Sequence, residues 1–256
     1  MKKTIHWILQ GKGGVGKSLI SSLLFQYYKS TQADENIVGI DTDPNNSTFT
    51  KMKSLNVKFL QLLNEDKKID AREFDKMIEI FFTEQNNTYI IDNGASSFIP
   101  LIAYLKENDV LKALTEYFNI VIHVPIVGGE GQEETLEGFD KLVATFKDDA
   151  VFIVWINEFF GKVIDEQGNA LESMDIYTKN EDFLGNDEHS GGIIKISKPD
   201  PQTTGKDLEI LTKKHMTIAE AMDSNLPEFN FMVKQRLRVF SKKIYSSLDT
   251  IPILNG

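Results

Sequence analysis

The sequence predicts an α/β fold with a mainly parallel sheet of about seven or eight strands, flanked by helices on both faces. Short β-branched runs alternate with longer segments whose apolar residues recur at helical spacing, the pattern of repeated βαβ units. Most of these runs are continuously apolar, as expected for strands covered on both sides. The length of 256 residues is roughly 1.7 times that of a typical ~150-residue domain. We expect one large domain spanning residues 1–256.

Seven apolar runs predict the strands of this sheet. They cover residues 4–9, 37–40, 57–62, 89–91, 120–125, 151–156 and 193–197. Turn-forming residues bound most of them, which separates each strand from the helix that follows.

Helical spacing and capping residues predict the helices. Between residues 18 and 29, Leu19, Leu23 and Tyr27 share one helical face. The pair Asp70 and Glu73 predicts the start of a helix that reaches about Gln85, and Thr217 with Glu220 predicts another start. The final helix is predicted over residues 231–248, with Asn230 as its cap.

The segment 158–191 does not fit the strand and helix alternation. It is polar and rich in Gly, Asn and Asp. We expect an insertion made of a hairpin around residues 167–169 followed by a short helix.

Composition excludes several classes of protein. The formal net charge is −10, so a general attraction to nucleic acid or anionic lipid is not expected. The chain has no cysteine, which excludes disulfides and cysteine metal sites, and its four histidines show no metal-ligand spacing. No apolar run approaches the ~20 residues that cross a bilayer. We expect a cytoplasmic protein without a membrane partner.

The strongest chemical signal follows the first predicted strand. Residues 11–18 read GKGGVGKS, which matches the phosphate-loop pattern G-x-x-x-x-G-K-[ST] between a strand and a helix. Glycines let backbone N–H groups surround phosphates, Lys17 reaches the β and γ phosphates, and the Ser18 hydroxyl is a ligand for Mg²⁺. The alternative is a glycine-rich turn without a ligand. The predicted nucleotide-binding residues of this loop are Gly11, Gly13, Gly14, Val15, Gly16, Lys17, Ser18 and Leu19.

A second lysine, Lys12, stands at the start of the loop, where its side chain cannot easily reach its own γ-phosphate. Residues 12–18 resemble the deviant Walker A motif K-G-G-x-G-K-[ST] of the ParA/MinD family of ATPases. In that family the extra lysine reaches across a dimer interface to the partner's nucleotide. The resemblance implies a P-loop NTPase fold, ATP with Mg²⁺ as cofactors, and a homodimer that forms on ATP binding.

Three aspartates at strand ends complete the expected site. The apolar run 89–91 ends in Asp92, the pattern of an acid that organises Mg²⁺, and we expect it to act through water. The run 37–40 leads into Asp41-Thr42-Asp43-Pro44-Asn45, which is similar to the family's D-x-D-P-Q switch, with Asn45 in place of Gln. The resemblance implies that Asp43 orients the attacking water and that Asp41 braces the metal shell or the phosphate loop. For all three, a capped turn is the alternative.

Two further residues are expected to contact the base. The resemblance implies an Asn at the end of a late strand, and Asn157 follows the strand 151–156 with an amide that matches the hydrogen-bonding edge of adenine. Pro199, in the loop after the last strand, is expected to stack on the base. A plain turn-forming role is the alternative for Asn157.

The last helix carries a basic stripe in an otherwise acidic protein. Its cations are Lys234, Arg236, Arg238, Lys242 and Lys243. A solvated helix face is one interpretation, and salt-sensitive, non-specific DNA contact is the other.

Within the family, residues 7–10, 154–157 and 235–237 are similar to those of the TraL-type ATPases of conjugative plasmids. The resemblance implies a slowly hydrolysing, partner-stimulated ATPase switch in plasmid conjugation, mobilisation or partition, with Lys12, Lys17 and Asp43 as its catalytic residues. The alternative is a small-molecule phosphotransferase or ATP-dependent ligase on the same fold. Such an enzyme needs no lysine at position 12.

Overall fold

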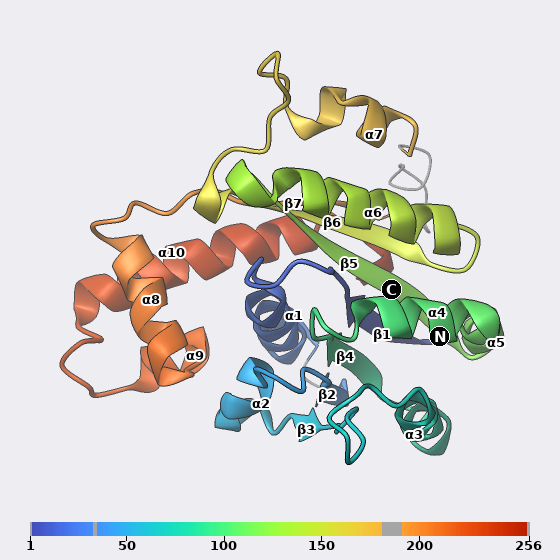
Figure 1. Ribbon diagram of the computed structural model, residues 1–256. Helices are drawn as coiled ribbons and strands as arrows, with labels where there is room; N and C mark the ends of the chain where they lie inside the picture. Colours follow the sequence, from blue (N-terminus) through green and yellow to red (C-terminus); the bar gives the residue numbers. More distant parts are fainter. Residues whose placement is uncertain (1, 33–34, 181–190, 255–256) are drawn as a thin grey trace.

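The computed structural model describes residues 2–32, 35–180 and 191–254. They form a seven-stranded sheet in the order β3-β2-β4-β1-β5-β6-β7, in which every pair of neighbouring strands is parallel (Figure 1). The strands are β1 (Lys3–Ile8), β2 (Ile37–Asp41), β3 (Lys58–Phe59), β4 (Thr88–Asp92), β5 (Phe118–Val127), β6 (Val151–Asn157) and β7 (Gly192–Ile196). The predicted α/β class and parallel sheet are confirmed.

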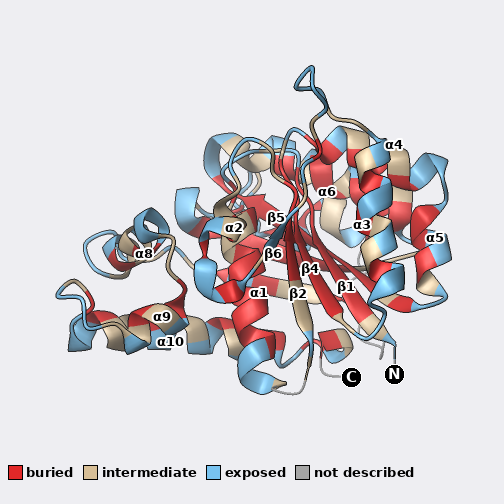
Figure 2. Cartoon of the chain, turned by 90° about the horizontal axis from the view of Figure 1, so that it is seen from below, coloured by how far each residue is buried: buried red, intermediate tan, exposed pale blue. Residues whose placement is uncertain are grey.

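Helices cover both faces of the sheet, so its central strands are buried (Figure 2). The helices are α1 (Lys17–Thr31), α2 (Thr48–Lys51), α3 (Arg72–Thr83), α4 (Phe98–Glu107), α5 (Val110–Thr115), α6 (Gln132–Phe146), α7 (Asp175–Thr178), α8 (Thr204–Lys214), α9 (Ile218–Asp223) and α10 (Phe231–Leu248). One core packs α3, α4, α5 and α6 on the sheet, and a second core packs α1, α2 and the C-terminal helices on the other face.

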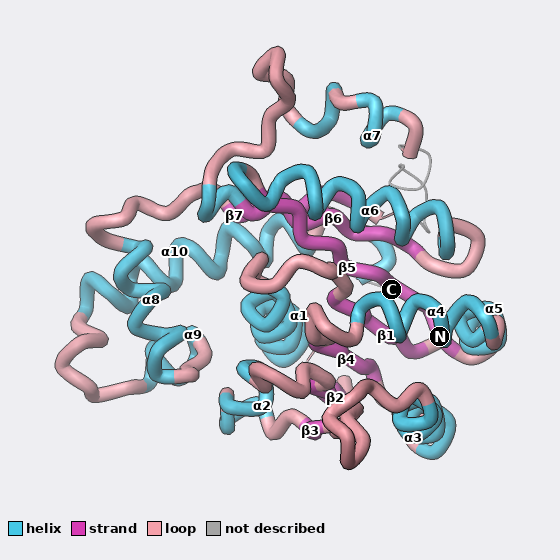
Figure 3. The backbone as a smooth tube through the Cα atoms, in the orientation of Figure 1, coloured by secondary structure: helices cyan, strands magenta, loops and turns pink. Residues whose placement is uncertain are grey.

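The strand order fixes where a ligand can bind. β1 lies between β4 and β5, and the chain leaves β1 through α1 toward β2 on one side, whereas β5, β6 and β7 extend the sheet on the other. In open parallel sheets such a reversal leaves a crevice at the carboxyl ends of the strands. The loop between β1 and α1 follows the carboxyl end of β1 (Figure 3), which is where this rule places a ligand.

Two predicted helix starts are confirmed in detail. Thr217 and Glu220 form a reciprocal capping box at α9. The side chain of Asn230 accepts hydrogen bonds from the backbone N–H groups of Met232 and Val233 at the start of α10. Within the described residues, no helix has the length and apolar character needed to cross a bilayer.

Two predicted elements are shorter than expected. The strand predicted over 57–62 contains only Lys58–Phe59, because it pairs at the sheet edge with β2 alone and both of its residues are exposed. The helix predicted from Asp70 to about Gln85 covers Arg72–Thr83 with Ala71 at the N-cap position. The Asp70 carboxylate still accepts a hydrogen bond from the Arg72 N–H at 2.9 Å.

The polar segment after β6 contains a turn and short helices over its described part. Ile164 and Ala170 form an antiparallel bridge around Gly168, which has a φ of +84°. The short helix α7 follows, and residues 181–190 of the predicted insertion lie outside the described residues.

A buried chain of hydrogen bonds crosses the centre of the sheet. The Trp155 indole N–H donates to His123 Nδ1 at 2.9 Å, His123 Nε2 lies 3.0 Å from His6 Nδ1, and His6 Nε2 lies 2.9 Å from the Tyr28 hydroxyl. Because the indole can only donate, His123 carries its proton on Nε2 and His6 carries its own on Nε2. Both rings are therefore neutral and satisfied. Burial lowers the pKa of His6 to about 3 and holds the pKa of His123 well below its usual range.

These depressed pKa values predict a loss of stability in mild acid. Between pH 6.5 and about 3 the unfolded chain binds protons on His6 and His123 that the folded chain does not bind, so stability falls as pH falls. From pH 7.5 to 5.5 each histidine should contribute about 1.4 kcal/mol to the decrease in the free energy of unfolding. Urea unfolding at the two pH values measures it.

The test is best made on the Asp92→Asn variant. Burial raises the pKa of Asp92 to about 7, so this carboxyl stabilises the fold as pH falls through 7 and opposes the histidines. An equal free energy of unfolding at pH 7.5 and 5.5 in that variant would show that the histidines are not held neutral.

Candidate functional site

The phosphate loop joins β1 to α1 in a conformation that depends on glycine. Gly14 and Gly16 have φ values of +76° and +98°, which side chains strongly disfavour, and Gly16 is the N-cap of α1. The Lys17 amine folds back over the loop and donates to the Lys12 carbonyl oxygen at 3.0 Å. The Lys17 amine is nearly buried, and the Lys12 carbonyl oxygen takes a hydrogen bond that this amine could otherwise give to an oxygen of a ligand.

The loop is fixed at its start by Gln10, which sequence reasoning did not identify. Its buried amide donates to the carbonyl oxygens of Pro125 at 3.1 Å and Thr135 at 3.0 Å, and its Oε1 accepts from the Gly11 N–H at 2.9 Å. One side chain thus connects the loop to β5 and α6. A Cβ at Gly138 would lie 2.2 Å from Gln10 Oε1, so α6 can approach this amide only with glycine there.

Asp92 has the properties of a metal-organising acid. Its carboxylate is 2% exposed, and within the described residues neither oxygen has a hydrogen-bond partner. Burial raises the pKa of Asp92 to about 7, whereas the nearby Ser18 hydroxyl and Lys17 amine favour the charged form. A buried carboxylate without a partner, close to a serine hydroxyl, is a set of oxygen ligands that fits Mg²⁺.

Lys17 shares this environment. Burial lowers the pKa of its amine, and the carboxylates of Asp92 and Asp43 oppose that shift. The loop lysine, Asp92 and Asp43 are therefore brought together, as predicted from their strand ends.

Asp41, which is expected to brace the metal shell or the phosphate loop, has hydrogen-bond partners on both carboxylate oxygens. Its Oδ1 accepts from the Asp43 N–H at 3.0 Å, and its Oδ2 accepts from the Thr50 N–H at 2.9 Å and the Thr50 hydroxyl at 3.0 Å. Asp41 therefore links the end of β2 to α2 and braces residues 41–50, which we call the first switch segment. Its role toward a metal stays a prediction.

The first switch segment contacts residues 93–97 after β4, which we call the second switch segment. Asn45 Nδ2 donates to the Ser96 hydroxyl at 3.0 Å. A Cβ at Gly94 would lie 2.9 Å from both Cα and Cγ of Asp43. Asp43 itself accepts from the N–H groups of Asn45 and Asn46 through the same oxygen, Oδ1.

Lys12 points away from its own loop toward α6. Its amine lies 2.9 Å from Glu134 Oε2, and the Lys12 side chain is 38% exposed. The sequence does not reveal this ion pair, because the two residues lie 122 positions apart in the chain.

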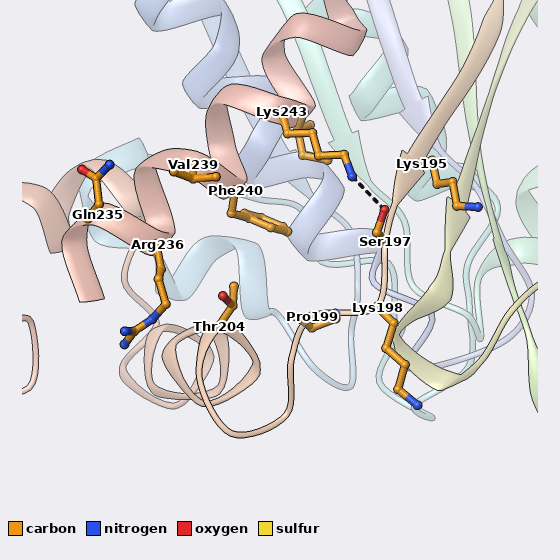
Figure 4. Close-up of a pocket in the computed structure, with 11 residues that line it drawn as sticks. Lys195, Ser197, Lys198, Pro199, Thr204, Gln235, Arg236, Val239, Phe240 and Lys243 are labelled. Carbon is orange, nitrogen blue, oxygen red and sulfur yellow. Dashed lines mark hydrogen bonds between the residues drawn. The ribbon is translucent and has the colours of Figure 1, made fainter. Parts of the chain in front are cut away.

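The predicted base-contact residues have other partners in this structure. Asn157 Nδ2 donates to the Val15 carbonyl at 3.0 Å and its Oδ1 accepts from the Phe159 N–H at 3.2 Å, so the amide braces the phosphate loop. Pro199 lines a cavity of about 290 Å³ between β7, α8 and α10 (Figure 4). The base-contact roles stay predictions.

The predicted basic stripe divides into paired and exposed cations. Arg236 makes a bidentate ion pair with the buried Asp207, with Nη2 3.0 Å from Oδ1, and Lys234 donates to the Ser224 carbonyl. Both therefore serve the packing of α10. Arg238, Lys242 and Lys243 are exposed.

Comparisons with known proteins identify the family. No protein-family model matches the chain. Two proteins called TraL from Escherichia coli are 36% and 35% identical to it over 252 residues, covering 98% of this chain and 99% of each relative. The chain belongs to the TraL family. The resemblance predicted from the loop and from residues 154–157 is thereby confirmed.

The TraL-family chain also shares its fold with a cell division protein. The solved structure of MinD cell division protein from Aquifex aeolicus superimposes with a TM-score of 0.50 at 16% sequence identity, covering 93% of this chain and 96% of that chain. At this identity the likeness concerns the fold, which is that of the ParA/MinD-type P-loop NTPases.

The contact between Gln10 and Gly138 gives a prediction with an unusual sign. Gly→Ala inside a helix normally stabilises by about 0.5–1 kcal/mol. Gly138→Ala should instead destabilise by about 1–3 kcal/mol, because the new methyl group overlaps the buried amide. Urea unfolding measures the change. The double variant with Gln10→Ala should lose less than the sum of the single changes, and strict additivity would contradict the contact.

Proposed function

We propose that this protein is a ParA/MinD-like switch ATPase: it binds Mg-ATP, dimerises around it, hydrolyses it slowly, and acts in plasmid conjugation, mobilisation or partition. The observation that carries the proposal is the opposite placement of the two loop lysines. Lys17 folds over the loop, whereas Lys12 extends outward to the exposed first turn of α6. An amine held outside its own phosphate loop, in an exposed and therefore weak ion pair, is placed to serve a second nucleotide.

Each residue of the site has a role in this proposal. The loop N–H groups and Lys17 hold the phosphates, and Asp92 and Ser18 hold Mg²⁺, which supplies charge neutralisation at the phosphate oxygens. Asp43 lies where the two switch segments meet and orients the attacking water. Asn157, Val15 and Gln10 keep the loop in the binding conformation.

The plasmid role is supported by family membership. The relatives carry the name TraL, and the resemblance in the loop and in residues 235–237 points in the same direction. DNA contact is also proposed, through Arg238, Lys242 and Lys243, because these three cations stay exposed.

A small-molecule phosphotransferase or ATP-dependent ligase is the competing function, and it would need a substrate beside the phosphates. ATP turnover that depends on a metabolite, without any change of oligomeric state, would favour it. The outward Lys12 favours the dimeric switch instead.

Sedimentation velocity with ATP, with ADP and without nucleotide tests the proposal. The wild-type chain should dimerise with ATP only. Lys17→Ala should lose nucleotide binding, because the phosphates lose their buried cation. Lys12→Ala should keep ATP affinity within about threefold but weaken dimerisation at least tenfold. Normal ATP-dependent dimers of Lys12→Ala would disprove the role of this lysine.

The other catalytic residue is tested by turnover. Asp43→Ala should keep the ATP-dependent dimer and lose ATP hydrolysis, because the attacking water loses the carboxylate that orients it.

Dimerisation must also release Lys12 from Glu134. An exposed ion pair contributes less than about 1 kcal/mol, and a symmetric dimer breaks two of them. Glu134→Gln should therefore tighten ATP-dependent dimerisation by about three- to tenfold, with the difference shrinking in high salt. The neighbouring exposed Glu133, changed to Gln, is the control and removes the same charge without the ion pair. Equal effects of the two variants would indicate general electrostatics only.

A further inference from the structure

We propose that the pair Phe159 and Phe160, which we call the aromatic ledge, and the cavity beside it form a docking surface for a second copy of this chain. The inference rests on the proposed function and deepens it, because it names a surface that no motif predicted. The structure places this surface on the same face as the phosphate loop, where one wall of the cavity is made by the loop itself.

The aromatic ledge exposes two large apolar rings. Phe159 is 50% and Phe160 56% exposed, and the rings meet edge to face with centroids 5.1 Å apart. Aromatic side chains that share a patch mark interaction sites more often than single exposed residues do. Phe160 also lines a cavity of about 490 Å³, whose other walls are residues 12–15 of the loop and 127–131 after β5.

The ledge is held rigidly. A Cβ at Gly128 would lie 2.2 Å from the Lys162 carbonyl oxygen, so the two backbone segments are in direct contact. Gln132, at the start of α6, donates to the Ile164 carbonyl at 2.6 Å and accepts from the Ile164 N–H at 3.1 Å. In Figure 1 the segment after β6 accordingly lies beside the first turn of α6. A preformed aromatic surface loses little conformational entropy on binding.

The occupant that fits this surface is another copy of the chain. Lys12, whose charge is proposed to serve a partner's triphosphate, is in the wall of the cavity, so the ledge adjoins that contact. The cavity walls carry both signs of charge, Lys12 and Glu130, so two copies can face each other about a twofold axis without bringing only like charges together. Five of the residues that line the cavity are glycines, which have no side chain and so allow the backbone of a second copy to approach closely. They are Gly13, Gly14, Gly128, Gly129 and Gly131.

Sedimentation velocity of Phe160→Ser with ATP tests the surface. Loss of a central aromatic contact on both copies should weaken ATP-dependent dimerisation about tenfold or more, while ATP affinity of the monomer stays unchanged. The matched control is Phe82→Ser, which removes an exposed phenyl group (39% exposed) at the end of α3. This control should dimerise like the wild type.

The outcomes separate the two proposals. If the wild type dimerises with ATP and Phe160→Ser dimerises equally well, the docking surface is wrong and the switch function stands. If the wild type stays monomeric with saturating ATP, the dimeric switch fails, and the docking surface fails with it.

A second measurement does not depend on how the serine variant folds. The chain has no cysteine, so Lys162→Cys, next to the ledge, can carry a single environment-sensitive dye. ATP should shift its emission with a dependence on protein concentration, as burial by a second copy requires. A shift independent of concentration, or no shift while the labelled chain dimerises, would overturn the docking surface.

Discussion

The buried amide of Gln10 is the contact on which the geometry of the site depends. It joins the end of the central strand to the neighbouring strand and to α6 through three hydrogen bonds. A buried polar side chain is costly unless all its groups are paired, and here the pairing partners are backbone groups of separate elements. The position of the loop is thus set by the whole sheet, and the left-handed glycines only let the chain follow that path.

The electrostatics of the crevice follow from the same burial. Asp92 loses its water without gaining a hydrogen bond, and Lys17 loses its water for one carbonyl oxygen. Burial raises the free energy of the charged form of both Asp92 and Lys17, and the opposite charge of each group stabilises the charged form of the other. A ligand that brings both a cation and an anion would satisfy both groups together, which is the physical basis for proposing Mg²⁺ with a phosphate at this site.

Much of the fold and of the loop could be predicted from the sequence, because both are local patterns. Continuous apolar runs marked the strands, and the spacing of residues 11–18 marked the loop. The length of the edge strand β3 was overestimated, because an apolar run in the sequence does not reveal that the strand pairs with only one neighbour. The contacts of Gln10 and Glu134 were missed because their partners lie far away in the sequence, on other elements. Glycine at position 138 was the available signal for the Gln10 contact, since a helix interior disfavours it.

The contact between the two switch segments has a consequence for how the molecule can respond. Asn45 donates a hydrogen bond to Ser96, and Gly94 lies against Asp43. A displacement of either segment is therefore expected to move the other, and under the proposed function the loss of a phosphate would reach both segments together. Surfaces that adjoin the two segments would change in step, and a regulator bound beside one of them would govern both.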